Sequence, residues 1–338
     1  MVGAMNAPAD PGLVLSSSLL RLAGWLQGEG YAFSTVTPAT HERVNARPQA
    51  RQARDLRDVF GWSRPFPASL LPDAATDPLR AAGLLLPAGG GLLRSAVRFS
   101  TLRGQLFAHS AYPTVEEDAV FFGPDTCRFV TLVEQELQRE PLPRGARILD
   151  VGCGSGAGGI LAALAASQSQ PRLALTDINA RALRFAAANA AHANCGDAQL
   201  AQGDLFLALD GQYDLILANP PYLNDGAQRT YRHGGGRWGE ALSERIVREG
   251  VERLAPEGRL VLYTGAAIVD GRDPLLEALQ PLLDAGGFRW SYREIDPDVF
   301  GEELEQPAYM DAERIAAVGL VVQRHDHPMR VHLHPAMA

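Results

Sequence analysis

Lysine is absent from this chain of 338 residues, so every one of its 31 basic side chains is an arginine. Acidic residues outnumber them and give a net charge of -8, which argues against wholesale binding to a phosphate backbone but leaves room for a local basic patch. Cysteine is also scarce: Cys127, Cys153 and Cys195 are too few and too scattered for a disulfide framework or a zinc cluster. We therefore expect neither disulfides nor a metal site.

Long apolar segments are missing as well. No run of eighteen apolar residues occurs, and the N-terminus lacks a charged stretch followed by an apolar one. We therefore expect a cytoplasmic protein with no membrane span and no signal peptide. The hydrophobic content of 46% is ordinary for a soluble globular protein, and the length favours two domains.

The most informative glycines lie in the segment 148–160, which reads ILDVGCGSGAGGI. A buried strand ends at Asp150, and Gly152, Gly154 and Gly156 alternate through a turn where side chains would block a ligand. A helix is expected from residue 157, and its unpaired N–H groups favour a polar or anionic ligand group. The pattern predicts a nucleotide-like ligand, although a dinucleotide-binding unit has similar glycines and a tight turn needs no ligand.

An acidic residue follows at the expected distance. The segment 171–179, PRLALTDIN, predicts a second strand that ends in Asp177. A carboxylate about 20 residues past the glycines, at the end of the next strand, can accept hydrogen bonds from both hydroxyls of a ribose. This second match strengthens the prediction of a nucleotide site.

A fourth strand, 213–218, leads into Asn219-Pro220-Pro221-Tyr222. The two prolines remove two N–H donors and favour an extended backbone, so the Asn219 side-chain oxygen and the Pro220 carbonyl can face outward as two acceptors. Such a pair suits the N–H groups of a planar amide or amine, on which Tyr222 can stack. In isolation the same tetrapeptide could be a plain turn.

From Val120 onward the chain resembles the release-factor glutamine N5-methyltransferases, within the N6-adenine/N5-glutamine (small methyltransferase domain) group of class I S-adenosylmethionine (SAM) methyltransferases. The residues that carry the resemblance are Gly123-Pro124-Asp125-Thr126 with Leu132-Val133-Glu134, the D-x-G-x-G-x-G run at 150–156, Asp177, Gly203-Asp204, the motif 219–222, and Gly235-Gly236-Arg237-Trp238-Gly239 followed by Arg245-Ile246. Gly123 stands where the family usually has an arginine. The N-terminal region does not resemble the family's helical bundle.

The resemblance implies SAM as cofactor and S-adenosyl-L-homocysteine as product. The implied catalytic residues are Asn219, Pro220 and Tyr222, and the implied cofactor-binding residues are Asp150, Gly152, Gly154, Gly156, Asp177, Asp204, Phe206 and Asn219. In the family, Asp204 would hold the adenine amino group with the apolar Phe206 against the ring. As a helix cap, Asp204 would need no ligand.

We expect an α/β fold with a Rossmann-like, seven-stranded class I methyltransferase sheet. Its later parts are a helix at 239–254, strands near 259–265 and 288–295, a helix at 273–285, and an antiparallel last strand at 318–323, after an acidic insertion at 297–317 of unknown use. The predicted domains are an accessory domain (1–112), a linker helix (113–145), the methyltransferase domain (146–324) and a His-rich tail (325–338). The glycine-rich segment 223–237 is expected to form a mobile loop over the site.

The accessory domain is expected to be helical or winged-helix-like and to recognise the substrate. We predict helices at 11–27, 39–60 and 78–85, then a hairpin around Arg103-Gly104. The arginines of 39–60 form either a basic face for RNA or an acidic partner, or a solvated helix face, which we favour. In the tail, His325, His327, His332 and His334 could trap a metal, but their lack of order argues that they are incidental.

The leading functional hypothesis is N5-methylation of a protein glutamine, for instance in a translation factor. A nucleobase amine in structured RNA or DNA, adenine N6 or guanine N2, fits the same pair of acceptors. A small-molecule amine or amide is a third substrate class. A non-catalytic SAM-binding protein is the alternative outside enzymes, but it would be expected to lose Asp177 or the acceptors at 219–222.

Overall fold

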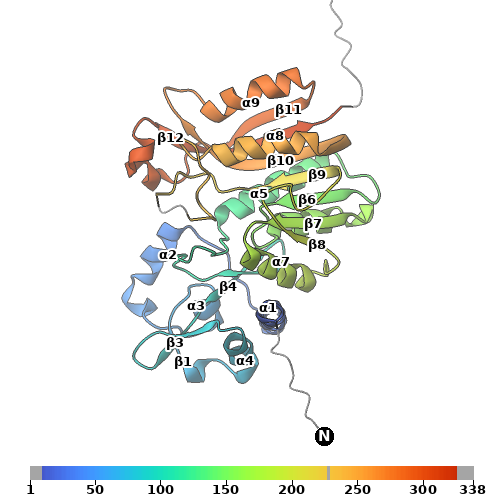
Figure 1. Cartoon of the computed structure of the whole chain (residues 1–338). Coiled ribbons are helices and arrows are strands. Elements are labelled where there is room, and N and C mark those ends of the chain that lie inside the picture. The colour runs from blue at the N-terminus through green and yellow to red at the C-terminus, as the bar shows by residue number, and fades with distance from the viewer. Residues whose placement is uncertain (1–9, 227–228, 326–338) are drawn as a thin grey trace, which may run out of the picture.

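A mainly parallel seven-stranded sheet organises the chain from residue 147 onward in the computed structural model, which describes residues 10–226 and 229–325 (Figure 1). The sheet order is β11-β12-β10-β9-β6-β7-β8. Its strands are β6 (Arg147–Val151), β7 (Arg172–Asp177), β8 (Gln199–Gln202), β9 (Tyr213–Ala218), β10 (Leu254–Ile268), β11 (Arg289–Asp296) and β12 (Arg314–Gln323).

The strand order reverses between β6 and β9. From β6 the chain winds outward through β7 to β8, and it then returns to the other side of β6 with β9 and β10. Strand β12 is antiparallel to both β10 and β11. The expected sheet with an antiparallel last strand is therefore confirmed. In parallel sheets of this kind, ligands bind at the carboxyl ends of the strands where the order reverses.

Helices cover both faces of the sheet because the central strands are apolar on both sides. Leu215 and Leu217 of β9 lie in one core, and Ile216 and Ala218, which point the other way, lie in the other. The first core includes side chains of α5 (Pro124–Arg139), α6 (Ala157–Ala165) and α7 (Ala180–His192), and the second includes those of α8 (Ala241–Glu252) and α9 (Pro274–Ala285).

The last part of the sheet departs from the sequence-based boundaries. Strand β12 begins at Arg314, so the segment expected to be an insertion up to residue 317 ends at 313. Residues 314–317 pair with β10 instead, because their alternating apolar side chains fit both cores. The acidic segment 297–313 contains the short 3-10 turns η4 (Gly301–Glu305) and η5 (Pro307–Tyr309).

The predicted helix over 39–60 is wrong as a single element. The chain forms α2, which ends at Asn45, a 3-10 turn that begins at Pro48, and α3, for which the Asp55 side chain accepts a hydrogen bond from the Asp58 N–H. Proline 48 has no N–H to continue the first helix, and an aspartate cap favours a new start. The predicted helix at 78–85 is also misplaced: it spans Asp73–Ala81, followed by a strand from Leu85.

The N-terminal region combines helices with two small antiparallel sheets, β1-β3-β2 and the hairpin β4-β5. The hairpin is confirmed, with Arg103 and Gly104 at positive φ between its strands. The elements are α1 (Pro11–Gly28), α2 (Pro38–Asn45), η1 (Pro48–Ala50), α3 (Leu56–Phe60), β1 (Phe66–Pro67), η2 (Ala68–Leu70), α4 (Asp73–Ala81), β2 (Leu85–Pro87), β3 (Leu92–Ser95), β4 (Val97–Leu102) and β5 (Gln105–Ser110).

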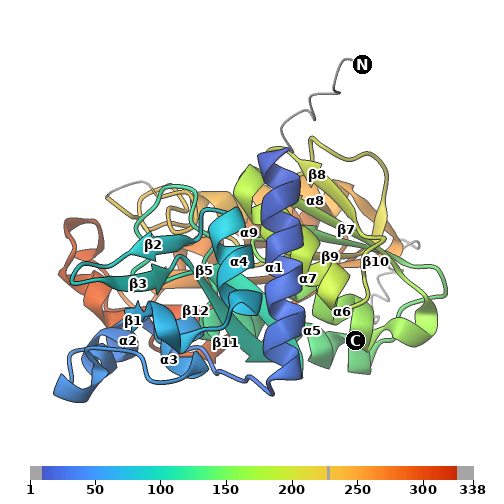
Figure 2. The same cartoon turned by 90° about the horizontal axis from the view of Figure 1, so that it is seen from below.

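Helix α7 joins this region to the sheet domain. Figure 2 shows α1 running beside α7, and Ser16 donates a hydrogen bond to the Arg184 carbonyl at 3.1 Å. The buried Asn189 side chain bonds both the N–H and the carbonyl of Ala108 in β5, at 2.8 and 3.0 Å. One amide thus satisfies a backbone edge that would otherwise be buried without partners. The predicted domain boundaries remain predictions.

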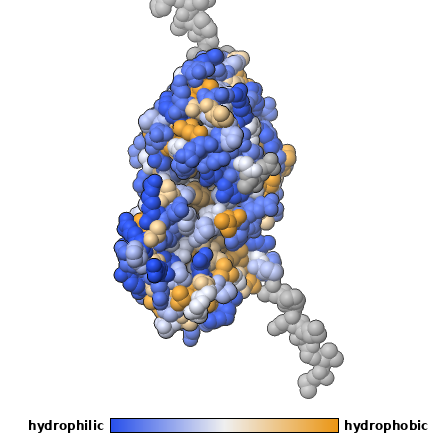
Figure 3. Space-filling view, turned by 90° about the vertical axis from the view of Figure 1, so that its left-hand side faces the viewer, coloured by the Kyte–Doolittle hydropathy of each residue, from blue (hydrophilic) through white to orange (hydrophobic). Residues whose placement is uncertain are grey.

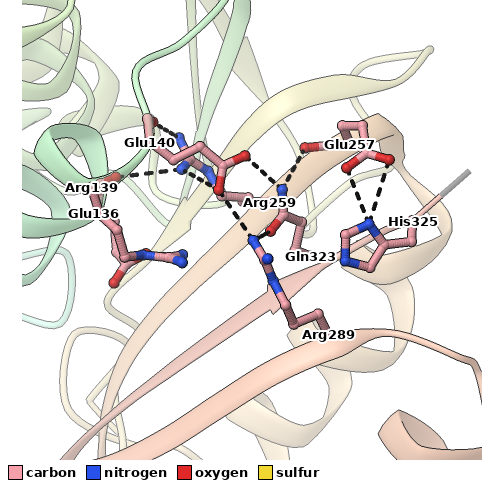
Figure 4. A network of polar contacts seen from close by, with 8 residues as sticks. All are labelled: Glu136, Arg139, Glu140, Glu257, Arg259, Arg289, Gln323 and His325. Atoms are coloured by element: carbon pink, nitrogen blue, oxygen red, sulfur yellow. Dashed lines mark hydrogen bonds and ion pairs between the residues drawn. The ribbon is translucent and has the colours of Figure 1, made fainter.

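Arg259 ties the end of α5 to the sheet (Figure 4). Its guanidinium is buried and donates to the carbonyls of Glu136 and Glu140, at 3.3 and 2.6 Å. A cation at a helix C-terminus satisfies carbonyls that have no partner within the helix. Burial lowers the pKa of Arg259, and the Glu140 carboxylate at 3.5 Å opposes that effect. Helix α5 is fixed at this end, while its other end reaches the site.

Candidate active site

A cavity of about 390 Å³ lies at the carboxyl ends of β6, β7 and β9. Three of the sequence motifs meet there: the glycine turn after β6, the aspartate that ends β7 and the segment that follows β9. Its lining includes Phe121, Asp125, Asp150, Gly152, Gly154, Asp177, Asp204, Leu205, Asn219, Pro220, Tyr222, Tyr231, His233 and Phe300. The reversal of the strand order thus coincides with the predicted site.

The glycine turn leaves its backbone bare toward the cavity. Gly152 and Gly154 have φ of 65° and 54°, and a Cβ at either would project into open space. Gly156 has another role: at φ 78° it begins α6, where a Cβ would press against Ile160 and Ala186. It does not line the cavity. Two of the three predicted glycines therefore border the space in which a ligand would lie.

A buried carboxylate, Asp150, and a half-buried one, Asp177, stand behind this turn. Asp177 accepts hydrogen bonds from the N–H groups of Gly154 and Asn179, both at 2.8 Å, which hold it at the cavity wall. Asp150 accepts from the Gly159 N–H at 2.7 Å. Burial raises the pKa of both, that of Asp150 to about 7, with the nearby Asp177 charge adding to the shift. A cationic group in the cavity would favour their ionised forms.

Phe206 was expected to lie against the adenine ring, but the structure places it elsewhere. Asp204 lines the cavity, but it also pairs with Arg245 at 2.8 Å. Phe206 is buried in the core beneath α8 and α9, and its ring lies so close to Gly250 that a Cβ there would touch it. Leu205, at φ 49°, lines the cavity instead. The left-handed backbone conformation of Leu205 turns the Phe206 side chain toward the core, which the sequence pattern did not reveal.

The motif 219–222 places two oxygens and one ring at the cavity. Asn219 and Pro220 line it, and within the described residues neither the Asn219 side chain nor the Pro220 carbonyl has a hydrogen-bond partner. The Tyr222 ring also lines the cavity, while its hydroxyl donates to Asp125 at 2.8 Å. Burial and the Asp125 charge raise the pKa of Tyr222 far above its ordinary value, so the phenol stays protonated.

Asp125 belongs to the motif 123–126, which carries part of the family resemblance, and it has a role at the site. It also accepts a hydrogen bond from the buried Tyr263 hydroxyl at 2.8 Å, and Arg128 pairs with it at 3.1 Å. The sequence suggested only a turn and a helix cap here. Thr126 bonds the Gly123 N–H, as a cap would, whereas Asp125 fixes the position of Tyr222.

The glycines of 234–239 pack against the backbone of the motif. A Cβ at Gly234 would overlap the Pro221 carbonyl oxygen and the Gly239 backbone, and one at Gly239 would overlap the Tyr222 carbonyl. Only glycine permits an approach this close. These residues therefore support Tyr222 from behind, in addition to being part of the loop that was expected to cover the site.

The acidic segment 297–313 braces that loop, a role the sequence did not suggest. The Tyr309 hydroxyl donates to the Trp238 carbonyl at 2.9 Å and accepts from the Asn224 N–H at 2.8 Å. Glu303 pairs with Arg232, and Phe300 lines the cavity. The segment thus forms one lip of the cavity mouth.

The other lip comes from the stretch before α5. The Tyr231 hydroxyl donates to the Thr114 carbonyl at 2.7 Å, and its ring stacks on Phe121 with centroids 6.2 Å apart. Both rings line the cavity. A flat substrate group that entered here would meet aromatic surface.

The described residues contain no group of three or more His, Cys, Asp or Glu side chains arranged to hold a metal ion. Of the four tail histidines, His325 lies 3.1 Å from Glu257, and His327, His332 and His334 lie outside the described residues. No helix among the described residues is long and apolar enough to cross a membrane.

The strand order, the glycine turn and the carboxylate that ends β7 are those of the class I SAM-dependent methyltransferase fold. Residues 131–269 match the model of the methyltransferase small domain.

Two curated relatives are similar to it. A release factor glutamine methyltransferase of Deinococcus radiodurans is 34% identical over 191 residues, which cover 53% of this chain and 63% of that protein. A ribosomal RNA small subunit methyltransferase C of Chromohalobacter salexigens is 36% identical over 124 residues, 37% of this chain and 33% of the relative. The chain thus spans less than two thirds of the length of either.

Among solved structures, a methyltransferase from Pyrococcus furiosus has a TM-score of 0.38 and 20% identity, covering 58% of this chain and 83% of that one.

Proposed function

We propose that the chain is an N-methyltransferase that transfers a methyl group from SAM to the side-chain amide of a protein glutamine. One observation carries the proposal: the free oxygens of Asn219 and Pro220 line the same cavity as Gly152, Gly154 and Asp177. The acceptor site and the nucleotide site are therefore parts of one space.

The residues at the nucleotide end suit SAM. Gly152 and Gly154 leave open space where side chains would stand, and Asp177 can accept hydrogen bonds from ribose hydroxyls. Leu205 offers apolar contact to an adenine ring, and Asp204 can accept from its amino group. When bound, SAM supplies an electrophilic sulfonium methyl group, and S-adenosyl-L-homocysteine is the product.

Asn219 and Pro220 would orient the acceptor. An amide NH₂ can donate one hydrogen to the Asn219 side-chain oxygen and the other to the Pro220 carbonyl, which aims the nitrogen lone pair away from both. Such positioning can account for about 7–11 kcal/mol of a barrier between two reactants. As the nitrogen attacks and the methyl–sulfur bond breaks, its N–H groups become more acidic, so both hydrogen bonds strengthen in the transition state, which favours turnover over binding. One N–H proton is then released to solvent, which leaves the neutral methylated amide.

Protein glutamine is the favoured acceptor because the Deinococcus radiodurans relative, which covers more of this chain than the RNA-modifying one, is named for that reaction. A nucleobase amine in RNA is the second candidate. The Chromohalobacter salexigens relative supports it, and so do the stacked rings of Phe121 and Tyr231 at the mouth. In either case we propose a partner from the translation machinery and a cytoplasmic site of action.

Radiolabelled SAM tests the proposal. The protein is incubated with a purified bacterial release factor or with ribosomal RNA, and the labelled product is hydrolysed and analysed. We expect label on glutamine N5 in the wild type and about 100-fold slower labelling in Asn219→Ala. Label on adenine N6 or guanine N2 would establish the second candidate, and no transfer to either would contradict the proposed acceptor classes.

A further inference from the structure

Four exposed arginines lie within fifteen positions of one another in the N-terminal region. They are Arg43, Arg47, Arg51 and Arg57, which we call the arginine face, and within the described residues none lies within 4.0 Å of a carboxylate. Their segment, 42–64, carries six arginines and three acidic residues in a chain with a net charge of -8. A surplus of positive charge on an acidic protein marks a place where an anionic surface would be attracted.

The arginine face lies beside the cavity mouth. Thr35, just before α2, donates a hydrogen bond to the Phe122 carbonyl at 3.1 Å, next to a residue that lines the cavity. His41 of α2 stacks on Tyr112 with ring centroids 4.0 Å apart. Two residues further on, the Thr114 carbonyl accepts from Tyr231, which also lines the cavity. Helix α2, which carries Arg43, therefore lies next to the lip formed by the stretch before α5, a stretch that itself contains Glu116, Glu117 and Asp118.

The segment that forms the other lip of the cavity mouth is acidic. The segment 297–313 contains six acidic residues and no arginine, and its Phe300 lines the cavity. We call Asp298, Glu302 and Glu305 the acidic rim, because they are exposed and form no ion pair within the described part of the chain. Figures 1 and 2 both place α2 and this segment on the same side of the molecule.

Figure 3 looks onto that side. Hydrophilic residues cover much of the lower lobe, which holds the N-terminal region, and the surface is hollowed between the two lobes. A partner that delivers a side chain into the cavity must pass between the two lips and contact both.

The opposite charges of the arginine face and the acidic rim favour one kind of partner. RNA carries a negative phosphate at every nucleotide, so a strand across the mouth would be attracted by the arginine face and repelled by the acidic rim. A folded protein can place acidic groups opposite the arginine face and basic groups opposite the acidic rim. We infer that the arginine face and the acidic rim together form a docking site for a protein that is acidic on one side of its acceptor loop and basic on the other. This inference rests on the proposed methylation of a protein.

Two charge-reversal variants test the site: Arg43→Glu with Arg47→Glu, and Glu302→Arg with Glu305→Arg. Matched controls make the same changes in net charge at exposed positions on other elements, Arg21→Glu with Arg172→Glu and Glu29→Arg with Glu252→Arg. The probes are a purified bacterial release factor, for which Kd is measured by calorimetry and KM and kcat by methyl transfer, and a labelled oligouridylate, for which Kd is measured by anisotropy. SAM affinity reports correct folding.

For the release factor at about 50 mM salt, we expect both reversals to raise KM and Kd by about tenfold relative to their controls, with kcat unchanged. The difference should vanish at about 500 mM salt, where charges on the surface are screened. RNA and protein binding respond differently to the two reversals. The oligouridylate should bind less tightly to the arginine-face variant and more tightly to the acidic-rim variant, whereas both variants should bind the release factor less tightly.

The inference is overturned if only the oligouridylate binds and responds with those opposite signs, if neither probe binds the wild type, or if neither reversal changes the affinity for the release factor. Binding that both reversals weaken, without any methyl transfer, would support the docking site and contradict the proposed function. Methyl transfer to the release factor that neither reversal affects would support the proposed function and contradict the docking site.

Discussion

Asp125 offers the sharpest test of how the site is held together. Its carboxylate accepts hydrogen bonds from the hydroxyls of Tyr222 and Tyr263, both at 2.8 Å, and both tyrosines are buried. In Asp125→Ala, both buried phenols would lose their acceptor. The hydrogen bonds are made to a charged group, for which each contributes about 1.5–3 kcal/mol, so we expect a loss of about 3–6 kcal/mol in the free energy of unfolding. The partly exposed pair with Arg128 adds little.

The variant should also lose activity, because Tyr222 borders the acceptor site and small misplacements can lower a rate by up to about 100-fold. Tyr222→Phe should lower kcat by about 10-fold or more, since its ring is no longer fixed by Asp125. Tyr263→Phe is the matched control: it removes an equivalent hydrogen bond to the same carboxylate but leaves Tyr222 in place.

Urea unfolding followed by circular dichroism gives the stability, and methyl transfer at saturating SAM gives kcat. A loss below about 1 kcal/mol in Asp125→Ala would refute the reasoning, because one unsatisfied buried hydroxyl alone costs about that much. Equal effects of Tyr222→Phe and Tyr263→Phe on kcat would show that Asp125 stabilises the fold without positioning the acceptor site.

Three further predictions concern the two ends of the cavity. Asn219→Ala should lower kcat by about 100-fold, as expected when one of few groups aimed at the transition state is removed, while calorimetry should show SAM affinity changed less than about threefold; an equal loss in both would contradict the assignment. Asp177→Ala should weaken SAM binding by about 10- to 100-fold, measured by the same titration, because the ribose loses a charged acceptor and Gly154 loses its partner. The pKa of Asp150, raised to about 7, predicts that SAM affinity is constant above pH 7 and falls as the pH drops below it, since the cation favours the ionised carboxyl. The stability of the ligand-free fold depends on pH in the opposite direction. The contribution of protonated Asp150 to the free energy of unfolding is complete below the ordinary aspartate pKa and is lost as the pH rises through about 7. Asp150→Asn should flatten both profiles, and a pH-independent affinity in the wild type would exclude this role.

Short motifs determined the sheet domain to a large extent. Strand β9 was predicted at its observed bounds, because a continuous apolar run between turn residues is typical of a strand buried on both faces. The glycine turn and Asp177 were found because a ligand-facing backbone needs glycine and because a strand end fixes where a carboxylate lies. Local periodicity failed in the N-terminal region, where Pro48 and the Asp55 cap divide a helical pattern that looked continuous.

What the sequence determined by itself is the chemistry that each segment can offer: bare glycine backbone, two free oxygens at 219–220, and carboxylates at strand ends. Only the tertiary structure decided which of these groups meet. It joined Asp125 to Tyr222 across 97 positions, moved Phe206 into the core in favour of Leu205, and set the acidic segment 297–313 against the loop beside the cavity. The reason is physical: periodicity and turn preferences act over a few residues, whereas contacts between distant segments depend on how buried surfaces pack and on which polar groups then need partners.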